Sequence, residues 1–289
     1  MVTVILPQCA FSVMKSCPVF LDKFLVTYVV WGNFVNVVAV VQARMASTRL
    51  PGKVLLKVID RPMLSIQLER IRQARQIEKI VIATTDNSVD DQIEEFAYIE
   101  NVAIYRGSEN DVLHRFKRAA EQNGADIIVR LTADCPLIDP EIIDYIVSIF
   151  KQKSHGCNVV SNAVPRSYPA GLDVECFSRQ ALEIACAETT SLYDREHVTP
   201  YFYRDPNRFN LQSVICYKNL SAERWTLDEW NDYELIRKIL EGLYVSNPFF
   251  RMKDIVDYLD LHPKLRDLNG RVQETPREIK DCVFGEKEK

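Results

Sequence analysis

A cluster of positively charged residues follows an apolar, strand-like run near the start of the sequence. The run VVAVVQ at 37–42 leads into ARMASTRLPGK, which brings Arg44, Arg49 and Lys53 together with small residues. Residues 44–61 carry a net charge of +4, because five cations face only Asp60, whereas the whole chain carries −4. Backbone N–H groups of small residues can approach phosphate oxygens, and Arg and Lys neutralise them. The loop predicts a triphosphate site, with a solvated basic connector as the alternative.

Two aspartates end strand-like runs and are candidates for holding a metal ion. Asp134 follows an apolar run, and Asp228 closes the segment Arg-Trp-Thr-Leu-Asp. Mg²⁺ prefers hard oxygen ligands and usually takes one or two carboxylates together with phosphate oxygens. We therefore expect Asp134 and Asp228 to converge on one Mg²⁺ beside Arg44 and Lys53. The alternatives are a turn-forming role for Asp134 and a helix N-cap role for Asp228.

A second pair of carboxylates indicates a site for a polar substrate. Asp173 and Glu175 occupy alternate positions, so they would share one face of a strand over 172–177. An edge strand with a solvated face is the alternative.

The strands and helices that would position these groups alternate along the first half of the chain. Short β-branched runs predict strands at 37–42, 79–84, 102–105 and 126–131. Apolar residues at helical spacing predict helices at 63–75, 89–98, 111–122 and 140–151. This alternation is typical of a mostly parallel, open α/β sheet with helices on both faces. Ligands of such sheets bind beyond the carboxyl ends of the strands, where the basic loop and Asp134 lie.

The second half follows a different pattern, which we expect to extend the sheet and to shape a substrate pocket. Strands are predicted at 158–161, 172–177 and 210–216. Helices are predicted at 179–187, 196–203, 231–241 and 252–259.

Composition narrows the function classes. A net charge of −4 and a pI near 5.7 lack the basic excess of nucleic-acid-binding proteins, so a nucleic-acid partner is disfavoured. Eight cysteines without a Cys-x-x-Cys pair and only four histidines predict reduced thiols, no structural zinc and a cytoplasmic setting. No firm membrane association is expected, because the apolar stretch 17–41 contains Asp22 and Lys23.

Six segments occurring in order resemble one family. Together they are similar to the spore coat polysaccharide biosynthesis protein F family, relatives of the CMP-KDO synthetases and acylneuraminate cytidylyltransferases. The resemblance spans about residues 37–260, and its segments are 42–55, 107–113, 130–137, 171–175, 195–201 and 224–228.

The resemblance implies a nucleotide-diphospho-sugar transferase fold, which is Rossmann-like, and a role for each segment. It implies that CTP is held by Gln42, Ala43, Arg44, Ser47, Arg49, Lys53 and Asp111. It implies Mg²⁺ at Asp134 and Asp228, with Arg44, Lys53 and Asp134 as catalytic residues. It places the acceptor near Asp173, Glu175, Arg195, Glu196 and His197. The first loop begins Gln-Ala-Arg where the sugar-activating synthetases often have Pro-Ala-Arg.

The extent of the resemblance indicates the domain boundaries. We expect an N-terminal extension at 1–36, a nucleotidyltransferase domain at 37–262 and a charged C-terminal tail at 263–289. The role of the extension is left open by the sequence. A homodimer is one alternative for the oligomeric state.

The expected reaction is attack by a sugar hydroxyl on the α-phosphorus of an NTP, which we expect to be CTP, with pyrophosphate leaving. One alternative is a glycosyltransferase of the same fold that uses a nucleotide-sugar, although its usual Asp-x-Asp motif is missing. The other is a noncatalytic nucleotide-binding protein in a polysaccharide assembly system.

Overall fold

The computed structural model describes residues 35–153, 156 and 158–270. The predicted N-terminal extension lies outside these residues except for Val35 and Asn36, and its role stays a prediction. Within the described part, no helix is long and apolar enough to cross a membrane.

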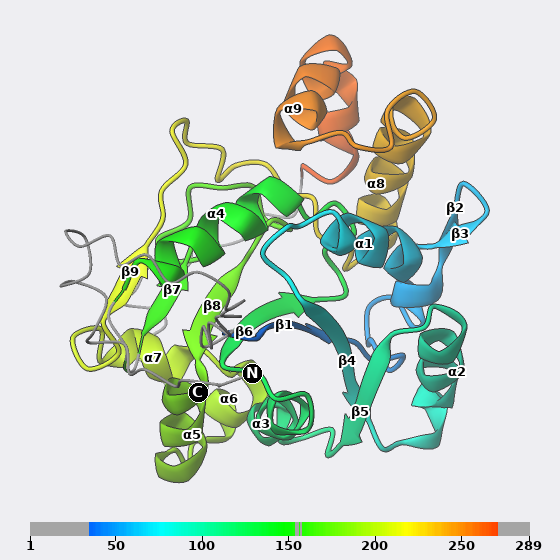
Figure 1. The fold of residues 1–289 in the computed structure, drawn as a ribbon. Coiled ribbons are helices and arrows are strands. Elements are labelled where there is room, and N and C mark those ends of the chain that lie inside the picture. Colours follow the sequence, from blue (N-terminus) through cyan, green and yellow to red (C-terminus); the bar gives the residue numbers. More distant parts are fainter. Residues whose placement is uncertain (1–34, 154–155, 157, 271–289) are drawn as a thin grey trace, which may run out of the picture. The chain divides into compact units, whose positions relative to one another are not determined.

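A seven-stranded sheet forms the centre of the fold, in the order β5-β4-β1-β6-β8-β7-β9 (Figure 1). The first four of these strands are parallel, β8 is antiparallel to both neighbours, and β9 is parallel to β7. The strands are β1 (Val37–Gln42), β4 (Lys79–Thr85), β5 (Ala103–Gly107), β6 (Ile127–Thr132), β7 (Val159–Ser161), β8 (Glu175–Ser178) and β9 (Leu211–Ser213). The predicted fold class, a mostly parallel open sheet with helices, is confirmed.

Strand β1 lies between β4 and β6 and marks the point where the strand order reverses. Its residues 37–41 are completely buried, which is why the strand reads as an uninterrupted apolar run. Gln42 pairs in register with Ala83 of β4 and Thr132 of β6, so β1 and β6 end level while β4 continues to Thr85. The basic loop and Asp134 therefore leave the sheet side by side, at the kind of switch point where α/β folds bind ligands.

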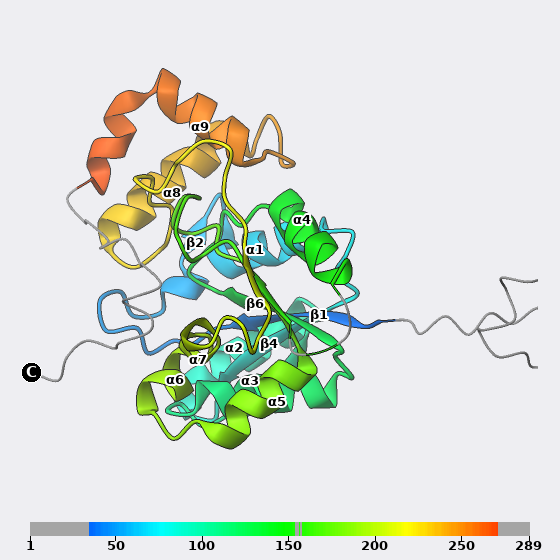
Figure 2. The same ribbon diagram turned by 90° about the vertical axis from the view of Figure 1, so that its left-hand side faces the viewer.

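Helices cover both faces of the sheet. Figure 2 shows α1 and α4 above the sheet and α3 and α5 below it. The alternate residues of β1 face two separate apolar clusters, one containing α1, α2 and α4 and the other containing α3 and α5. The helices are α1 (Met63–Arg72), α2 (Asp91–Ile99), α3 (Val112–Gln122), α4 (Pro140–Lys151) and α5 (Arg179–Glu188).

Four short elements near the basic loop were not predicted as separate elements. The 3-10 helix η3 (Lys53–Leu55) begins after Gly52, whose φ of 69° suits glycine. A small antiparallel pair, β2 (Lys57–Val58) and β3 (Arg61–Pro62), follows it. A second 3-10 helix, η4 (Ser88–Asp90), precedes α2.

The single helix predicted at 196–203 is wrong. The structure has two helices, α6 (Leu192–His197) and α7 (Pro200–Arg204). The break lies at Val198, which adopts a φ of 70°, and Pro200, which has no N–H to offer to a preceding helical turn, begins α7. The break turns the chain at the mouth of the pocket described below.

The last helices pack against the apolar cluster that contains α1, α2 and α4. Helices α8 (Trp230–Leu243) and α9 (Met252–Leu261) are followed by the 3-10 helix η5 (Pro263–Leu268). The Asn269 side chain is buried and donates to the Arg224 carbonyl and to Asp232. Residues 263–268 thus form η5 and Asn269 contacts the fold, while the tail boundary predicted at 263 stays a prediction. Residues 271–289 lie outside the described part.

Candidate active site

Asp134 and Asp228 meet at the ammonium group of Lys53. The Lys53 Nζ donates to Asp228 Oδ1 at 2.8 Å and to Asp134 Oδ2 at 3.4 Å. The backbone N–H of Leu227 donates to the Asp134 carbonyl at 2.7 Å, which joins the two segments. The expected convergence of two carboxylates 94 positions apart is confirmed, although a metal role for them stays a prediction.

Asp228 is held by groups on several sides. Its Oδ2 accepts from Arg224 at 2.8 Å and from the Thr226 hydroxyl at 3.1 Å, and Arg49 approaches its Oδ1 at 3.2 Å. The N-cap of α8 is Glu229, so the helix-cap alternative for Asp228 is wrong. With the other oxygen held by Arg224 and Thr226, Oδ1 is the oxygen that faces Lys53.

The charges at this centre stabilise one another. Burial alone would lower the pKa of Lys53, but Asp134 and Asp228 raise this pKa above its usual value. Burial alone would raise the pKa of Asp228, but Lys53 and Arg49 lower this pKa to about 2. Lys53 and Asp228 are therefore both charged at neutral pH.

Acid should destabilise the fold through Asp228. The pKa of this carboxyl is about 2 in the folded chain, against an ordinary value of 3.8, so the unfolded chain binds the proton more readily. Its stabilising contribution is complete above about pH 4 and is lost as the pH falls through 2. Between pH 5 and pH 3 the urea midpoint should fall less for Asp228→Asn than for the unsubstituted protein. Equal falls would contradict this pairing.

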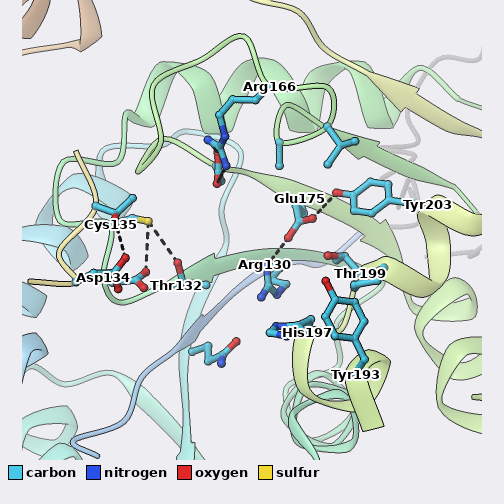
Figure 3. A pocket seen from close by; sticks show the side chains of 17 residues that line it. Arg130, Thr132, Asp134, Cys135, Arg166, Glu175, Tyr193, His197, Thr199 and Tyr203 are labelled. Atoms are coloured by element: carbon cyan, nitrogen blue, oxygen red, sulfur yellow. Dashed lines mark hydrogen bonds and ion pairs between the residues drawn. The ribbon is translucent and has the colours of Figure 1, made fainter. Parts of the chain in front are cut away.

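A pocket of about 250 Å³ adjoins the two aspartates. Figure 3 shows Thr132 and Asp134 on one side of it, with Tyr193, His197 and Tyr203 on the other. The lining is predominantly polar and charged, which suits a hydroxyl-rich ligand.

Glu175 is bound within the wall of this pocket. Its side chain is 5% exposed and accepts from Arg130 and from the Tyr203 hydroxyl (Figure 3). Burial alone would raise the pKa of Glu175, but Arg130, Tyr203 and Thr199 lower it. The predicted direct contact of Glu175 with substrate is not supported by this geometry, because its side chain is buried and its oxygens serve protein donors.

Asp173 faces the pocket from a different position than the sequence predicts. Strand β8 begins only at Glu175, so the two carboxylates do not share a strand face as expected. Asp173 accepts two hydrogen bonds from Arg166, both at 2.8 Å, and remains 27% exposed. This bidentate pair fixes one end of the pocket.

The predicted residues of the acceptor segment separate into two groups. His197 lines the pocket, where its ring packs edge-on against the ring of Tyr193. The two ring centroids are 4.4 Å apart. Arg195 instead donates to Asp111 at 2.8 Å and to a backbone carbonyl, and Glu196 is exposed. Neither Arg195 nor Glu196 belongs to the described lining, so their predicted substrate contacts are not supported.

The predicted nucleotide-binding residues are also spread over more than one place. Arg44 pairs with Glu109 at 3.5 Å and does not reach the two aspartates, so the expected cluster includes Lys53 but not Arg44. Asp111 caps α3 by accepting from the His114 N–H and pairs with Arg195. Gln42 lines the pocket, Ala43 is buried after β1, and Ser47 is half-buried in the loop.

Sequence reasoning assigned no role to several pocket residues. Arg130 had a usable signal, because a charged residue inside the buried run IIVRLT is unusual for a strand covered on both faces. Arg166 carried no signal of spacing, since it comes from a connecting segment, and Tyr193 lies in α6 ahead of the helix start predicted at 196.

The donor set of the centre fits Mg²⁺. Asp134 Oδ2 and Asp228 Oδ1 are hard oxygens that already face one cation. No group of three or more metal-binding side chains occurs within the described ranges. A metal ion here would have two protein oxygens and would complete its shell with phosphate oxygens and water, as Mg²⁺ commonly does.

Comparison with known proteins agrees with this arrangement. A family model described as cytidylyltransferase matches residues 38–253. The chain belongs to the cytidylyltransferase family. This cytidylyltransferase is therefore a nucleotidyltransferase enzyme, and the family resemblance seen in its sequence is confirmed.

Individual relatives support the same assignment. Spore coat polysaccharide biosynthesis protein SpsF of Bacillus subtilis is 32% identical, with 79% of this cytidylyltransferase and 95% of that protein covered. The structure of a cytidylyltransferase from Leptospira borgpetersenii is 32% identical, with a TM-score of 0.77 and 83% and 99% of the two chains covered. A CMP:2-keto-3-deoxy-manno-octonic acid synthetase complexed with CTP shares the fold at 18% identity, with a TM-score of 0.55 and 72% and 99% covered.

Proposed function

We propose that this enzyme transfers the CMP group of CTP to a hydroxyl of a sugar-like acceptor and releases pyrophosphate, with Mg²⁺ as its cofactor. The main observation in support of this proposal is that Asp134, Asp228 and Lys53 meet at the carboxyl edge of the sheet, directly beside a polar pocket. The CTP found in the solved synthetase of the same fold supports the choice of base.

The biological setting follows from the relatives. The name of the Bacillus subtilis relative supports a role in surface polysaccharide biosynthesis. A cytoplasmic location and a homodimer remain predictions.

The reaction requires positioning and charge neutralisation and no covalent enzyme intermediate. The acceptor oxygen forms a bond to the α-phosphorus, the bond from that phosphorus to the bridging oxygen breaks, and the hydroxyl proton is lost. Lys53 and Arg49 lie beside the aspartates and would neutralise the departing pyrophosphate. Bound Mg²⁺ would withdraw charge from the phosphate oxygens and make the α-phosphorus more electrophilic.

The acceptor would occupy the pocket beyond Asp134. Asp173, His197 and Tyr193 present hydrogen-bonding groups there, and Arg166 holds Asp173 in place. Hydroxyl groups of a sugar are matched by such a set of donors and acceptors.

Removing the carboxylate of Asp173 should change the KM for the acceptor but not the KM for CTP. We expect Asp173→Asn to raise KM for the acceptor about tenfold, because one charged contact is lost, and to leave KM for CTP unchanged. Initial rates with each substrate varied in turn measure both constants. Asp257→Asn, at a surface pair with Lys253, is the control. Equal changes in both KM values would contradict the assignment of the pocket to the acceptor.

Arg49 should contribute to nucleotide affinity without supporting the fold. Its side chain is 53% exposed, and its described partners are Asp228 and Glu229. We expect Arg49→Ala to weaken binding of CTP with Mg²⁺ about tenfold in calorimetric titration, through loss of a charge-assisted phosphate contact. Lys57→Ala removes a charge from an exposed position of the same segment and should leave the affinity unchanged. Unchanged affinity in Arg49→Ala would refute the contact.

The test of the proposed function is pyrophosphate release. Each of the four NTPs is combined with Mg²⁺ and a panel of sugars, including sugar acids. CTP should support release only when an acceptor is present. Release of a nucleoside mono- or diphosphate from a nucleotide-sugar, with no pyrophosphate from CTP, would instead support the glycosyltransferase alternative.

A further inference from the structure

Lys53 pairs with both of the aspartates that would hold the metal ion. Its Nζ is 2.8 Å from Asp228 Oδ1 and 3.4 Å from Asp134 Oδ2, the two oxygens assigned above to the metal. Only 11% of the lysine side chain is exposed, so solvent screens its charge poorly. An ammonium group and a divalent ion on the same two oxygens would repel each other strongly.

We propose that Lys53 keeps these carboxylates closed to free metal ions, and that the metal enters only together with a nucleoside triphosphate, whose phosphates draw the lysine away. This inference rests on the proposed function, because the incoming ligand is a complex of metal and triphosphate. It gives Lys53 a role in the order of binding, beyond the phosphate contact expected from the sequence.

The local charge balance favours this order. Arg49 and Arg224 also pair with Asp228, at 3.2 and 2.8 Å, so the two aspartates already face three cations in the free chain. Asp232 accepts from Arg224, and Glu229 pairs with Arg49 at 3.3 Å, so these two carboxylates offset part of that charge. A divalent ion added alone would leave a positive excess in a half-buried site. A triphosphate arriving with the ion brings negative charge, with which Lys53 and Arg49 can pair when the ion takes the aspartates.

The surrounding contacts allow the lysine to leave without loss of the site. Arg224 and Thr226 hold Asp228, and the Leu227 N–H holds the Asp134 backbone. These contacts do not involve Lys53. The lysine side chain has a flexible four-carbon stem, so its ammonium can move to a phosphate oxygen while the backbone stays in place.

Binding of Mn²⁺ to the full chain without nucleotide tests the inference. Electron paramagnetic resonance distinguishes free from bound Mn²⁺, and we expect weak binding by the unsubstituted protein. Lys53→Met should bind Mn²⁺ at least about tenfold more tightly, because the competing charge is gone. Lys57→Met removes the same charge from an exposed position and should bind as weakly as the unsubstituted protein. Adding Asp134→Asn to Lys53→Met should abolish the gain.

Two further measurements separate loss of the lysine charge from damage to the fold. Lys53→Met should unfold at lower temperature without metal, because two carboxylates lose their shared partner, and Mn²⁺ should restore much of the loss. Lys53→Arg keeps the charge and should bind Mn²⁺ weakly. Tight Mn²⁺ binding by the unsubstituted protein, or equal affinity in Lys53→Met, would overturn the inference. Absence of pyrophosphate release with the Mn²⁺ difference intact would instead refute the proposed reaction.

Discussion

Replacing Asp134 with asparagine should lower kcat at least about a hundredfold while weakening CTP binding by less than about tenfold. The amide keeps the shape of the side chain but not the charge that would hold the metal as charge develops on the bridging oxygen. The fold should survive, because the Asp134 side chain is 31% exposed and its carboxylate pairs with Lys53 at the rim of the pocket.

The kinetic measurement is pyrophosphate release at saturating CTP, acceptor and Mg²⁺, combined with a separate titration of CTP. Asp205→Asn, at an exposed turn, controls for general effects of removing a carboxylate. If Asp134→Asn retained more than about a third of kcat, the metal role of Asp134 would be wrong.

Asp228→Asn should reduce kcat by a similar factor, because Asp228 supplies the second oxygen of the same centre. The double variant with Asp134→Asn should lose little more than either single variant, as residues that act as one unit are not additive. Thermal unfolding is measured beside kcat to separate catalysis from stability.

Asp232 offers a matched control for Asp228. It is fully buried, pairs with Arg224 and accepts the backbone N–H groups of Asp228 and Glu229, but it does not contact Lys53. Asp232→Asn should therefore lower the unfolding temperature more than kcat. If Asp228→Asn cost only about 1 kcal/mol of stability and kept its kcat, its role would be structural.

The elements with strong local signals were predictable from the sequence. Strand β1 and helix α4 have the expected bounds, Val37–Gln42 and Pro140–Lys151. An apolar run of this length suits a strand buried on both faces. Asp139 before Pro140 caps α4 by accepting the Glu141 N–H at 2.8 Å, a local signal that marks the start of the helix.

The meeting of Asp134 and Asp228 was predictable for a topological reason. Asp134 follows a strand beside β1 at the carboxyl edge, and Asp228 ends the segment that returns to that edge before α8. What the sequence could not show is the partner of Lys53. A cation in a basic loop predicts a phosphate contact, whereas the free chain satisfies the ammonium with the two carboxylates.

The pocket wall was the least predictable part. The pairing of Arg166 with Asp173 depends on how a connecting segment folds back, and the burial of Glu175 depends on Tyr203 from α7 and Arg130 from β6. Such contacts join residues far apart in the chain, and no periodic pattern marks them. The helix break before Pro200 was visible as a proline, but its effect on His197 required the fold.

The most direct test of the central claim is to follow the phosphorus atoms of CTP. The purified enzyme is incubated with Mg²⁺, an accepted sugar, and CTP labelled at the α-phosphorus or, separately, at the γ-phosphorus. The account predicts that the α-label appears in a CMP-sugar and the γ-label in pyrophosphate, in equal amounts. Recovery of the γ-label as inorganic phosphate or on the sugar, with no label from the α-position in the sugar product, would contradict it.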